Sequence, residues 1–213
     1  MEYDQSKIEW RGTILSIQPR TRVWRYVTDN RTHYHIGYNL FLDGVVNGMS
    51  AQFAVAISEL QQQKAEFRIG DEIQGTAWTK EYPEREFADY YRAGSLRCLI
   101  RASANSGIAP PPWRIAPPDM QTYEDRGARM LSLSQWKTKC FQCVWASMSN
   151  VEIIWDFDKR LSKYRFESFC YGPKSCKFYK MGRARAIPYK GRGSSMDTGW
   201  LDDLCTEGRD YDE

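Results

Sequence analysis

Hydrophobic and polar residues alternate along most of the first half of the chain, as they do in strands that bury one face. The alternation predicts five strands, near residues 8–26, 32–44, 50–57, 68–80 and 94–103. Turns are expected at Asp43–Gly44 and at Gly70–Asp71. Residues 58–67 contain no glycine or proline and begin with Ser58, a favourable N-cap, so they predict a short helix.

The stretch FRIGDEIQGTAW, residues 67–78, resembles the start of the fourth strand in many OB-fold domains. The resemblance covers residues 8–104 and implies a five-stranded OB-type Greek-key barrel, in which the helix separates strands three and four. OB domains commonly bind single-stranded nucleic acid across strands two and three, with a basic groove and aromatic stacking platforms. The protein as a whole is therefore expected to be mostly β.

Arginines and aromatics alternate in RTRVWRY, residues 20–26, which indicates a basic face and an apolar face at the end of the first strand. The residues of this half that the resemblance and the pattern assign to nucleic acid are Arg20, Arg22, Trp24, Arg25, Tyr34 and Tyr38. The alternative for about half of these aromatics is core packing, because alternate residues of a barrel strand point inward.

A proline-rich stretch, residues 105–122, interrupts the pattern and predicts a linker between two modules. The expected organisation is a β-barrel domain over residues 1–104, this linker, a second module with a basic arm over 123–193, and an acidic tail over 194–213. Within the second module, VEIIWDF (151–157) and YRFESF (164–169) predict a β-hairpin that turns at the polar residues between them.

Four of the six cysteines form two pairs at the two ends of this hairpin, with spacings C-x2-C and C-x5-C. Two turns that each present two thiolates are typical of a zinc ribbon, so we expect a structural Zn(II) site. An iron–sulfur cluster, disulfides and plain burial of the thiols are the alternatives. The predicted ligands are Cys140, Cys143, Cys170 and Cys176; Cys98 is expected to be a buried strand residue, and Cys205 is left out of the site.

Charge adds a second basic region, although the net charge of the whole chain is only +3. Thirteen lysines and arginines against four carboxylates lie between Trp136 and Gly193, which indicates a surface for polyanions. A solvated charged surface without a partner is the alternative. An acidic protein is the alternative partner. The residues of this region expected to contact nucleic acid are Lys174, Lys177, Tyr179, Lys180, Arg183, Arg185, Lys190 and Arg192.

No stretch of the sequence approaches the roughly 18 consecutive apolar residues of a membrane span, and no secretory core begins the chain. We therefore expect a cytoplasmic protein without a membrane partner. The sequence also contains no P-loop, no GxGxxG after a strand and no GxSxG, so we expect no catalysis.

The leading hypothesis is a non-catalytic protein that binds single-stranded DNA or RNA by phosphate neutralisation and base stacking. A second hypothesis is an accessory subunit of an enzyme complex, since OB domains joined to zinc ribbons also resemble the accessory proteins of thiolase-type enzymes, although those place the ribbon first. A third is a metal-dependent nuclease that uses Asp156 and Asp158. His33 and His35 share a strand face and form a weaker candidate for a metal pair.

Overall fold

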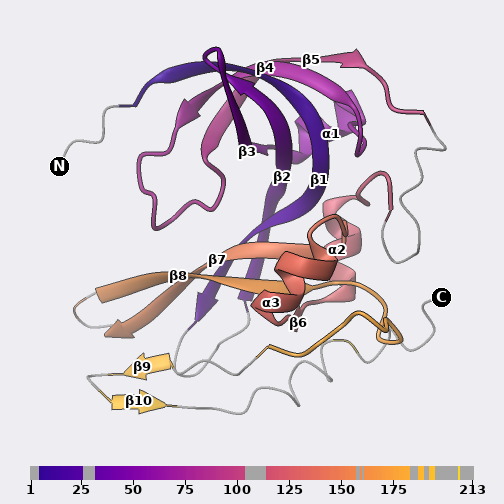
Figure 1. Cartoon of the computed structure of the whole chain (residues 1–213). Helices are drawn as coiled ribbons and strands as arrows, with labels where there is room; N and C mark the ends of the chain where they lie inside the picture. The colour runs from indigo at the N-terminus through magenta and orange to yellow at the C-terminus, as the bar shows by residue number, and fades with distance from the viewer. Residues whose placement is uncertain are drawn as a thin grey trace.

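The protein is mostly β, and eight of its strands form one mixed sheet. The structure is a computed structural model that describes residues 5–25, 32–103, 114–156, 159, 161–182, 187–189, 192–194 and 206. A separate pair of short strands, β9 and β10, lies at the bottom left of Figure 1.

Five strands of the N-terminal half close a hydrogen-bonded ring, drawn at the top of Figure 1. They are β1 (Lys7–Arg25), β2 (Thr32–Val46), β3 (Met49–Ile57), β4 (Glu72–Thr79) and β5 (Tyr90–Ile100). The order around the ring is β1-β2-β3-β5-β4 and back to β1. All neighbours are antiparallel except β3 and β5, which run parallel and meet at Val55 and Tyr90. The five strands expected from the alternation are thus confirmed.

The expected helix is α1 (Glu59–Ala65), and it lies between β3 and β4. Ser58 caps it through a capping box, in which its hydroxyl accepts from the Gln61 backbone and the Gln61 side chain accepts from the Ser58 backbone. Glu66 ends the helix in the left-handed conformation, with φ of 50°. Local sequence therefore explains both ends of this helix.

The turn between β2 and β3 differs from the prediction. It lies at Asn47–Gly48, where φ is +47° and +85°, as the favoured type I′ hairpin turn requires. Asp43 and Gly44 instead lie inside β2 and pair with both β1 and β3. A Cβ on Gly44 would stand 2.1 Å from the Arg11 carbonyl oxygen, so this glycine serves the close approach of β1 and β2 and not a turn.

The C-terminal half extends the same sheet beyond β1. Residues 22–25 of β1 pair in parallel with residues 150–153 of β7, and β7 forms an antiparallel hairpin with β8, as expected. The elements of this half are α2 (Met120–Arg126), β6 (Arg129–Met130), α3 (Leu133–Gln135), a π-helical turn (Trp136–Cys140), β7 (Ala146–Asp156), β8 (Leu161–Cys170), β9 (Ile187–Tyr189) and β10 (Arg192–Ser194).

One hydrophobic core joins the two halves: it includes Ile17 and Leu40 of the ring as well as Tyr123 and Val151 of the C-terminal half. Buried polar groups also cross this boundary: Ser16 and Gln18 both donate to the Phe141 carbonyl, at 2.5 and 2.6 Å, and Trp136 Nε1 donates to Gln18 Oε1 at 3.0 Å. Further along β1, Ser147 Oγ donates to the Pro19 carbonyl at 2.9 Å. Of the expected linker, residues 105–113 lie outside the described part, and its last residues already belong to α2.

A candidate nucleic-acid interface at the loop between β4 and β5

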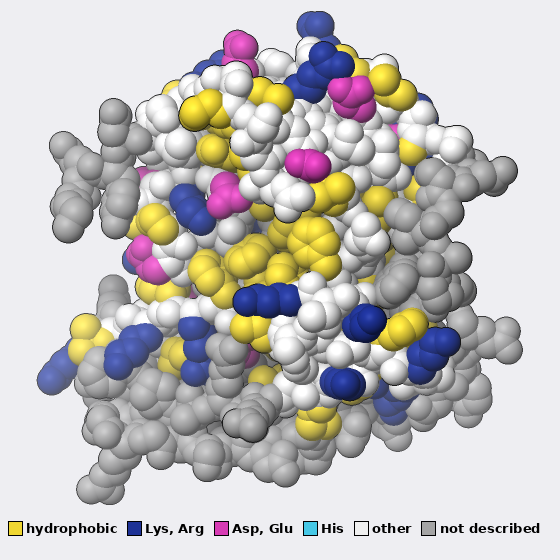
Figure 2. Space-filling view, viewed as in Figure 1, with side chains coloured by type: hydrophobic (Ala, Val, Ile, Leu, Met, Phe, Trp, Pro, Cys, Tyr) yellow, Lys and Arg dark blue, Asp and Glu magenta, His cyan; other side chains and the backbone are white. Residues whose placement is uncertain are grey.

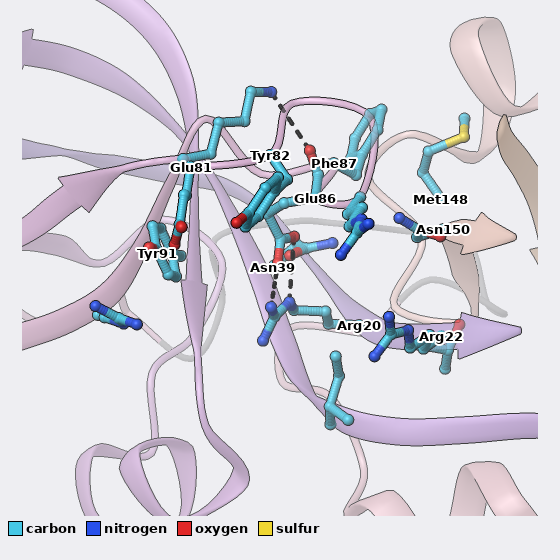
Figure 3. Close-up of a pocket in the computed structure, with 15 residues that line it drawn as sticks. Arg20, Arg22, Asn39, Glu81, Tyr82, Glu86, Phe87, Tyr91, Met148 and Asn150 are labelled. Carbon is cyan, nitrogen blue, oxygen red and sulfur yellow. Dashed lines mark hydrogen bonds and ion pairs between the residues drawn. The ribbon is translucent and has the colours of Figure 1, made fainter. Parts of the chain in front are cut away.

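A cavity of about 240 Å³ opens where the loop between β4 and β5 meets β1, β2 and β7 (Figure 3). It lies in the region that joins the ring to the C-terminal half. Its lining residues are Arg20, Thr21, Arg22, Ile36, Asn39, Lys80, Glu81, Tyr82, Arg85, Glu86, Phe87, Tyr91, Arg92, Met148 and Asn150.

The loop is held in place from both ends. Glu86 forms an ion pair with Arg20 of β1, in which Arg20 Nε donates to Glu86 Oε1 at 3.2 Å, and Lys80 Nζ donates to the Glu86 carbonyl at 3.4 Å (Figure 3). At the far end of the loop, Asp89 exchanges two hydrogen bonds of 2.9 Å with the Ala54 backbone on β3. These contacts fix the conformation of a loop whose sequence, of mixed charge and without strand alternation, does not by itself favour one conformation.

Guanidinium groups and aromatic rings alternate around the cavity. Arg85 lies 4.8 Å from the ring centroids of both Tyr82 and Tyr164, and Arg92 lies 5.0 Å from that of Tyr91. Arg92 also has φ of +53°, a left-handed conformation that costs a non-glycine residue about 1 kcal/mol. Stacked guanidinium groups keep their edge N–H donors available for phosphate oxygens or base edges.

The apolar wall of the cavity is Phe87, which the loop inserts into a group of aromatic rings. Its ring centroid lies 5.3 Å from that of Phe166, 6.0 Å from that of Trp136 and 6.1 Å from that of Phe41, at tilted or edge-on angles. Edge-to-face packing of this kind fixes ring positions. The wall is therefore a rigid surface on which a planar ligand could rest.

Two asparagines supply polar atoms to the cavity. Asn39 of β2 is 1% exposed, and neither its amide nitrogen nor its amide oxygen has a hydrogen-bond partner in the described part of the chain. Asn150 of β7 donates from Nδ2 to the Glu84 carbonyl at 3.3 Å, and its buried Oδ1 lacks a partner within the same described residues. Buried polar atoms without partners are costly, so these three groups call for an explanation.

The residues of the N-terminal half that were expected to contact nucleic acid fall into two groups in the structure. Arg20 and Arg22 line the cavity, and Arg22 pairs with Glu152 of β7 at 3.4 Å. Trp24 and Tyr34 stack on each other next to it along β1 and β2, with centroids 6.5 Å apart and an interplanar angle of 13°. Tyr34 is 58% exposed, so one face of this pair is accessible to a base. The side chain of Arg25 lies outside what the structure describes.

The prediction that Tyr38 contacts nucleic acid is wrong. It is 2% exposed, and its hydroxyl donates to the Pro118 carbonyl at 2.7 Å, so it packs the core between the ring and the segment that leads to α2. Burial, followed by the nearby carboxylates Glu59 and Asp119, raises the pKa of this phenol. A base does not reach this ring, because alternate residues of β2 point inward.

The expected basic arm is described only in part. Lys174, Lys177 and Lys180 lie on the surface in the segment after β8, fully or partly exposed. Tyr179 is engaged within the protein: its hydroxyl donates to the Met130 carbonyl at 2.9 Å, and the Arg129 guanidinium lies 3.9 Å from its ring centroid. Arg183, Arg185 and Lys190 lie outside the described residues, and Arg192 is described only as part of strand β10.

Charges are unevenly distributed over the face in Figure 2. Most visible carboxylates lie over the upper half, whereas lysine and arginine side chains predominate below it, where Figure 1 places β7, β8 and the short helices. The exposed lysines of the described C-terminal half include Lys137, Lys139, Lys163, Lys177 and Lys180. Of these, Lys163 lies on β8 opposite Ile153, three residues along β7 from Asn150, which lines the cavity.

The four predicted metal ligands gather near the base of the β7–β8 hairpin, where Cys170 pairs with Ala146, three residues after Cys143. Burial raises the pKa of Cys140 to about 12 and also raises the pKa of Cys143. Cys170 and Cys176, when ionised, add to both shifts, so the thiols lie near one another. Within the described residues, however, no three His, Cys, Asp or Glu side chains have the geometry of a metal site. The sheet thus assembles the neighbourhood but not a formed cluster.

The remaining candidate residues of the sequence analysis have different surroundings in the structure. Cys98 is exposed, contrary to the expectation of a buried strand residue. His33 and His35 face α2 and the segment after β8: His33 Nδ1 lies 3.2 Å from the Tyr171 hydroxyl, and the His35 ring stacks on Tyr123. Of the nuclease candidates, the Asp156 side chain and Asp158 lie outside the described residues.

Sequence reasoning missed most of the cavity. Lys80, Tyr82, Arg85, Phe87 and Arg92 fall in a stretch without strand alternation, KEYPEREFADYYR. Its net charge is slightly negative, which hides its basic residues. The signal that could have found it is the interleaving of arginine with tyrosine and phenylalanine, the same pattern that identified residues 20–26.

Comparisons with protein-family models, with curated proteins and with solved structures returned no match for this chain. No helix in the described part of the chain is long and apolar enough to cross a membrane. The function is therefore inferred from the site itself.

Proposed function

We propose that the protein binds single-stranded DNA or RNA without catalysing a reaction on it. The strand would run over the edge of the ring at β1 and β2 and along the loop between β4 and β5. The observation that carries the proposal is the cavity and its rim, which five lysine or arginine side chains and three aromatic rings line together. Charge for phosphates and rings for bases are the two requirements of single-strand binding.

The strand order β1-β2-β3-β5-β4 with α1 between β3 and β4 supports assigning the ring to the OB type. In that fold, the loops after strands one and four flank the usual site for oligonucleotides. Here the loop after β4 supplies Lys80, Tyr82 and Arg85, and the end of β1 supplies Arg20 and Arg22. The proposed interface therefore lies where this type of fold most often binds a strand.

Ion pairs at the rim do not remove its capacity to bind phosphate. Arg22 contacts Glu152 through one nitrogen at 3.4 Å, and Arg85 lies 3.7 Å from Glu84. Arginine has five N–H donors in a planar fork, so one carboxylate contact leaves several donors free. The carboxylates pre-position the guanidinium groups, which lowers the entropy lost when a strand binds.

We also propose that the four cysteines hold a structural Zn(II). Four buried or half-buried thiols near one another at the base of a hairpin are the donor set that zinc prefers, and their closure around the ion would complete a site whose neighbourhood the sheet already assembles. The residues that would hold it are Cys140, Cys143, Cys170 and Cys176. A site with four protein ligands has no open position, so the ion would stabilise the fold and not act on a substrate.

The experiment that tests nucleic-acid binding is fluorescence anisotropy of labelled single-stranded DNA and RNA, titrated with the protein at several salt concentrations. The expected result is binding whose logarithm falls linearly with the logarithm of salt, by about 0.7 for each phosphate neutralised. Absence of binding at low salt would discard the proposal, and the basic surface would then be a docking site for an acidic protein. Cleavage of the strand with Mg(II) or Mn(II) would instead support the nuclease.

A further inference from the structure

We infer that a single strand of nucleic acid places two of its bases on two separate stacking platforms, and that the C-terminal half of the protein holds the second platform in position. The first platform is the Trp24–Tyr34 pair of β1 and β2, and the second is the Tyr82–Arg85 pair of the loop between β4 and β5. The inference rests on the proposed function, which it deepens by giving individual bases a place and β8 a role.

The register of β1 and β2 builds the first platform. Arg22 lies directly opposite Tyr34, and Trp24 follows Arg22 by two residues, so Trp24 and Tyr34 are diagonal neighbours on one face of the two strands. Their rings stack with an interplanar angle of 13°. Trp24 is half-buried whereas Tyr34 is 58% exposed, so the tyrosine ring is the one that a base reaches.

A β-turn builds the second platform. The Arg85 backbone N–H donates to the Tyr82 carbonyl at 2.9 Å, and Pro83 holds the second position of this turn, which suits its fixed φ. The Arg85 guanidinium lies 4.8 Å from the centroid of the Tyr82 ring. Tyr82 is 45% exposed, as is the side chain of Arg85, so both are accessible. Unpaired bases stack on tyrosine rings and on guanidinium planes alike.

The C-terminal hairpin supports the second platform and connects it to the first. The Arg85 guanidinium also lies 4.8 Å from the ring centroid of Tyr164 on β8. The Tyr164 hydroxyl donates to Glu152 Oε1 at 3.2 Å, and Glu152 Oε2 accepts from Arg22 at 3.4 Å. A chain of contacts therefore runs from Arg85 through β8 and β7 to Arg22, which lies beside the first platform.

The distance between the platforms requires an extended strand. Strands β2, β1, β7 and β8 are successive neighbours in the sheet, with Tyr34 on β2 and Tyr164 on β8. Three intervals of about 4.8 Å separate β2 from β8 by about 14 Å. Phosphates along one strand of a double helix are only about 3.4 Å apart along its axis. Bases on the two platforms are therefore not stacked on each other, and Arg22, whose side chain is 40% exposed, lies between them to contact a phosphate.

The test compares two labelled strands about 12 nucleotides long, made of the type, DNA or RNA, that the protein binds more tightly. One strand is ordinary and the other is abasic, with the same phosphates but no bases. Stacking contributes only to the first, so the wild-type protein should bind the ordinary strand at least about tenfold more tightly.

Alanine substitutions identify the two platforms. In Tyr34→Ala and in Tyr82→Ala, the affinity for the ordinary strand should fall at least about fivefold each. The two effects should multiply in the double variant, because each ring takes a different base. The affinity for the abasic strand and the salt dependence should stay as in the wild type, because no charge is lost.

Tyr164 tests the role of the C-terminal half. In Tyr164→Leu we expect at least about threefold weaker binding of the ordinary strand, with the abasic strand unaffected, because Arg85 loses one of the two rings that position it. Tyr164→Phe keeps that ring and should bind within about twofold of the wild type.

Met49→Ala is the control variant. Met49 is 72% exposed and pairs with Val46, which lies opposite Trp10, at the other end of β1 from Trp24. Its substitution should leave both affinities as in the wild type.

The outcomes separate the inference from the proposed function. Equal, salt-dependent binding of the two strands by the wild type would overturn the inference and leave the proposed function standing. The same holds if either alanine variant binds like the wild type, or if it loses affinity for both strands equally. Unchanged binding in Tyr164→Leu would overturn the role of β8. No binding of DNA or RNA at low salt would overturn the inference and the proposed function together.

Discussion

At the scale of single residues, strand β2 shows how neighbouring polar side chains acquire different roles. Asn39 lines the cavity, His35 faces α2, and Tyr38 lies in the core, although all three lie within five residues. Alternation assigns residues to two faces but does not say what lies opposite each face. This is why Arg20 and Arg22 could be selected from the sequence, whereas Asn39 could not.

Arg22 provides a direct test of phosphate binding. In Arg22→Gln we expect the slope of the logarithm of affinity against the logarithm of salt to become shallower by about 0.7, since one phosphate contact is lost. The matched control is Arg11→Gln: Arg11 lies on the same strand, is 59% exposed, and also pairs with a glutamate, Glu72, at 2.7 Å, but it lies far from the cavity along β1. Equal effects of the two substitutions would contradict the proposed interface.

His35 predicts how stability depends on pH. Burial lowers its pKa to about 4, from an ordinary value of 6.5. As the pH falls below 6.5 the unfolded chain takes up a proton that the folded protein refuses, so folding stability should decline between about pH 6.5 and 4, at up to about 1.4 kcal/mol per pH unit. Urea unfolding at a series of pH values measures this decline.

The comparison variant is His35→Phe, which retains an aromatic ring against Tyr123 and Tyr171 but cannot titrate. Its stability should change less with pH in this window than that of the wild type. Identical pH profiles for the two proteins would show that other groups cause the dependence.

At the scale of elements, the strands and helix α1 follow from local sequence, and the loop between β4 and β5 does not. Ser58 and Gln61 suffice to begin α1, and period-two alternation suffices for β1 to β4. The loop is ordered by Arg20 and Ala54, which are distant in sequence. A local sequence pattern does not reveal contacts between distant residues. Of the cavity residues, the sequence therefore predicted only Arg20 and Arg22, which lie on strand β1.

The β7–β8 hairpin is the element for which metal removal is informative. We expect the purified protein to contain stoichiometric zinc. Cys143→Ser should abolish zinc retention and lower the free energy of unfolding by more than about 2 kcal/mol, because a buried ligand is lost. Metal analysis by mass spectrometry and urea unfolding measure the two effects.

Cys98→Ser is the control for this experiment, since Cys98 is exposed and lies in β5, outside the four-cysteine group. It should retain zinc and change stability by less than about 0.5 kcal/mol. A wild-type protein without zinc, or zinc retention in Cys143→Ser, would refute the metal proposal. A coloured protein that contains iron would support the iron–sulfur alternative.

At the scale of the whole molecule, β1 belongs to both halves. It closes the ring with β2 and β4 and also pairs with β7, and one hydrophobic core continues across the boundary. We therefore expect the full chain to unfold in one cooperative transition, with fluorescence and circular dichroism changing together. A chain truncated after residue 103 should be markedly less stable, because Ser16, Gln18 and Phe41 lose the partners that bury them.

A different unfolding behaviour would contradict the expectation of one cooperative transition. Two separate transitions in the full chain, one of them reproduced by the truncated chain, would establish two independent modules, as the proline-rich stretch suggests. The acidic tail expected over residues 194–213 lies almost entirely outside the described part of the chain; Thr206, which is described, is buried.

The sequence by itself determined the five strands of the ring, the capped helix and the hairpin between the cysteine pairs. Each of these depends on interactions within a few residues, such as alternation, a capping box or a polar turn. Only the tertiary structure decided that β1 pairs with β7, that Tyr38 is buried, and that Asn39 and Asn150 line one cavity. These depend on register and packing between distant segments, because a side chain's environment is set by whichever element lies against it.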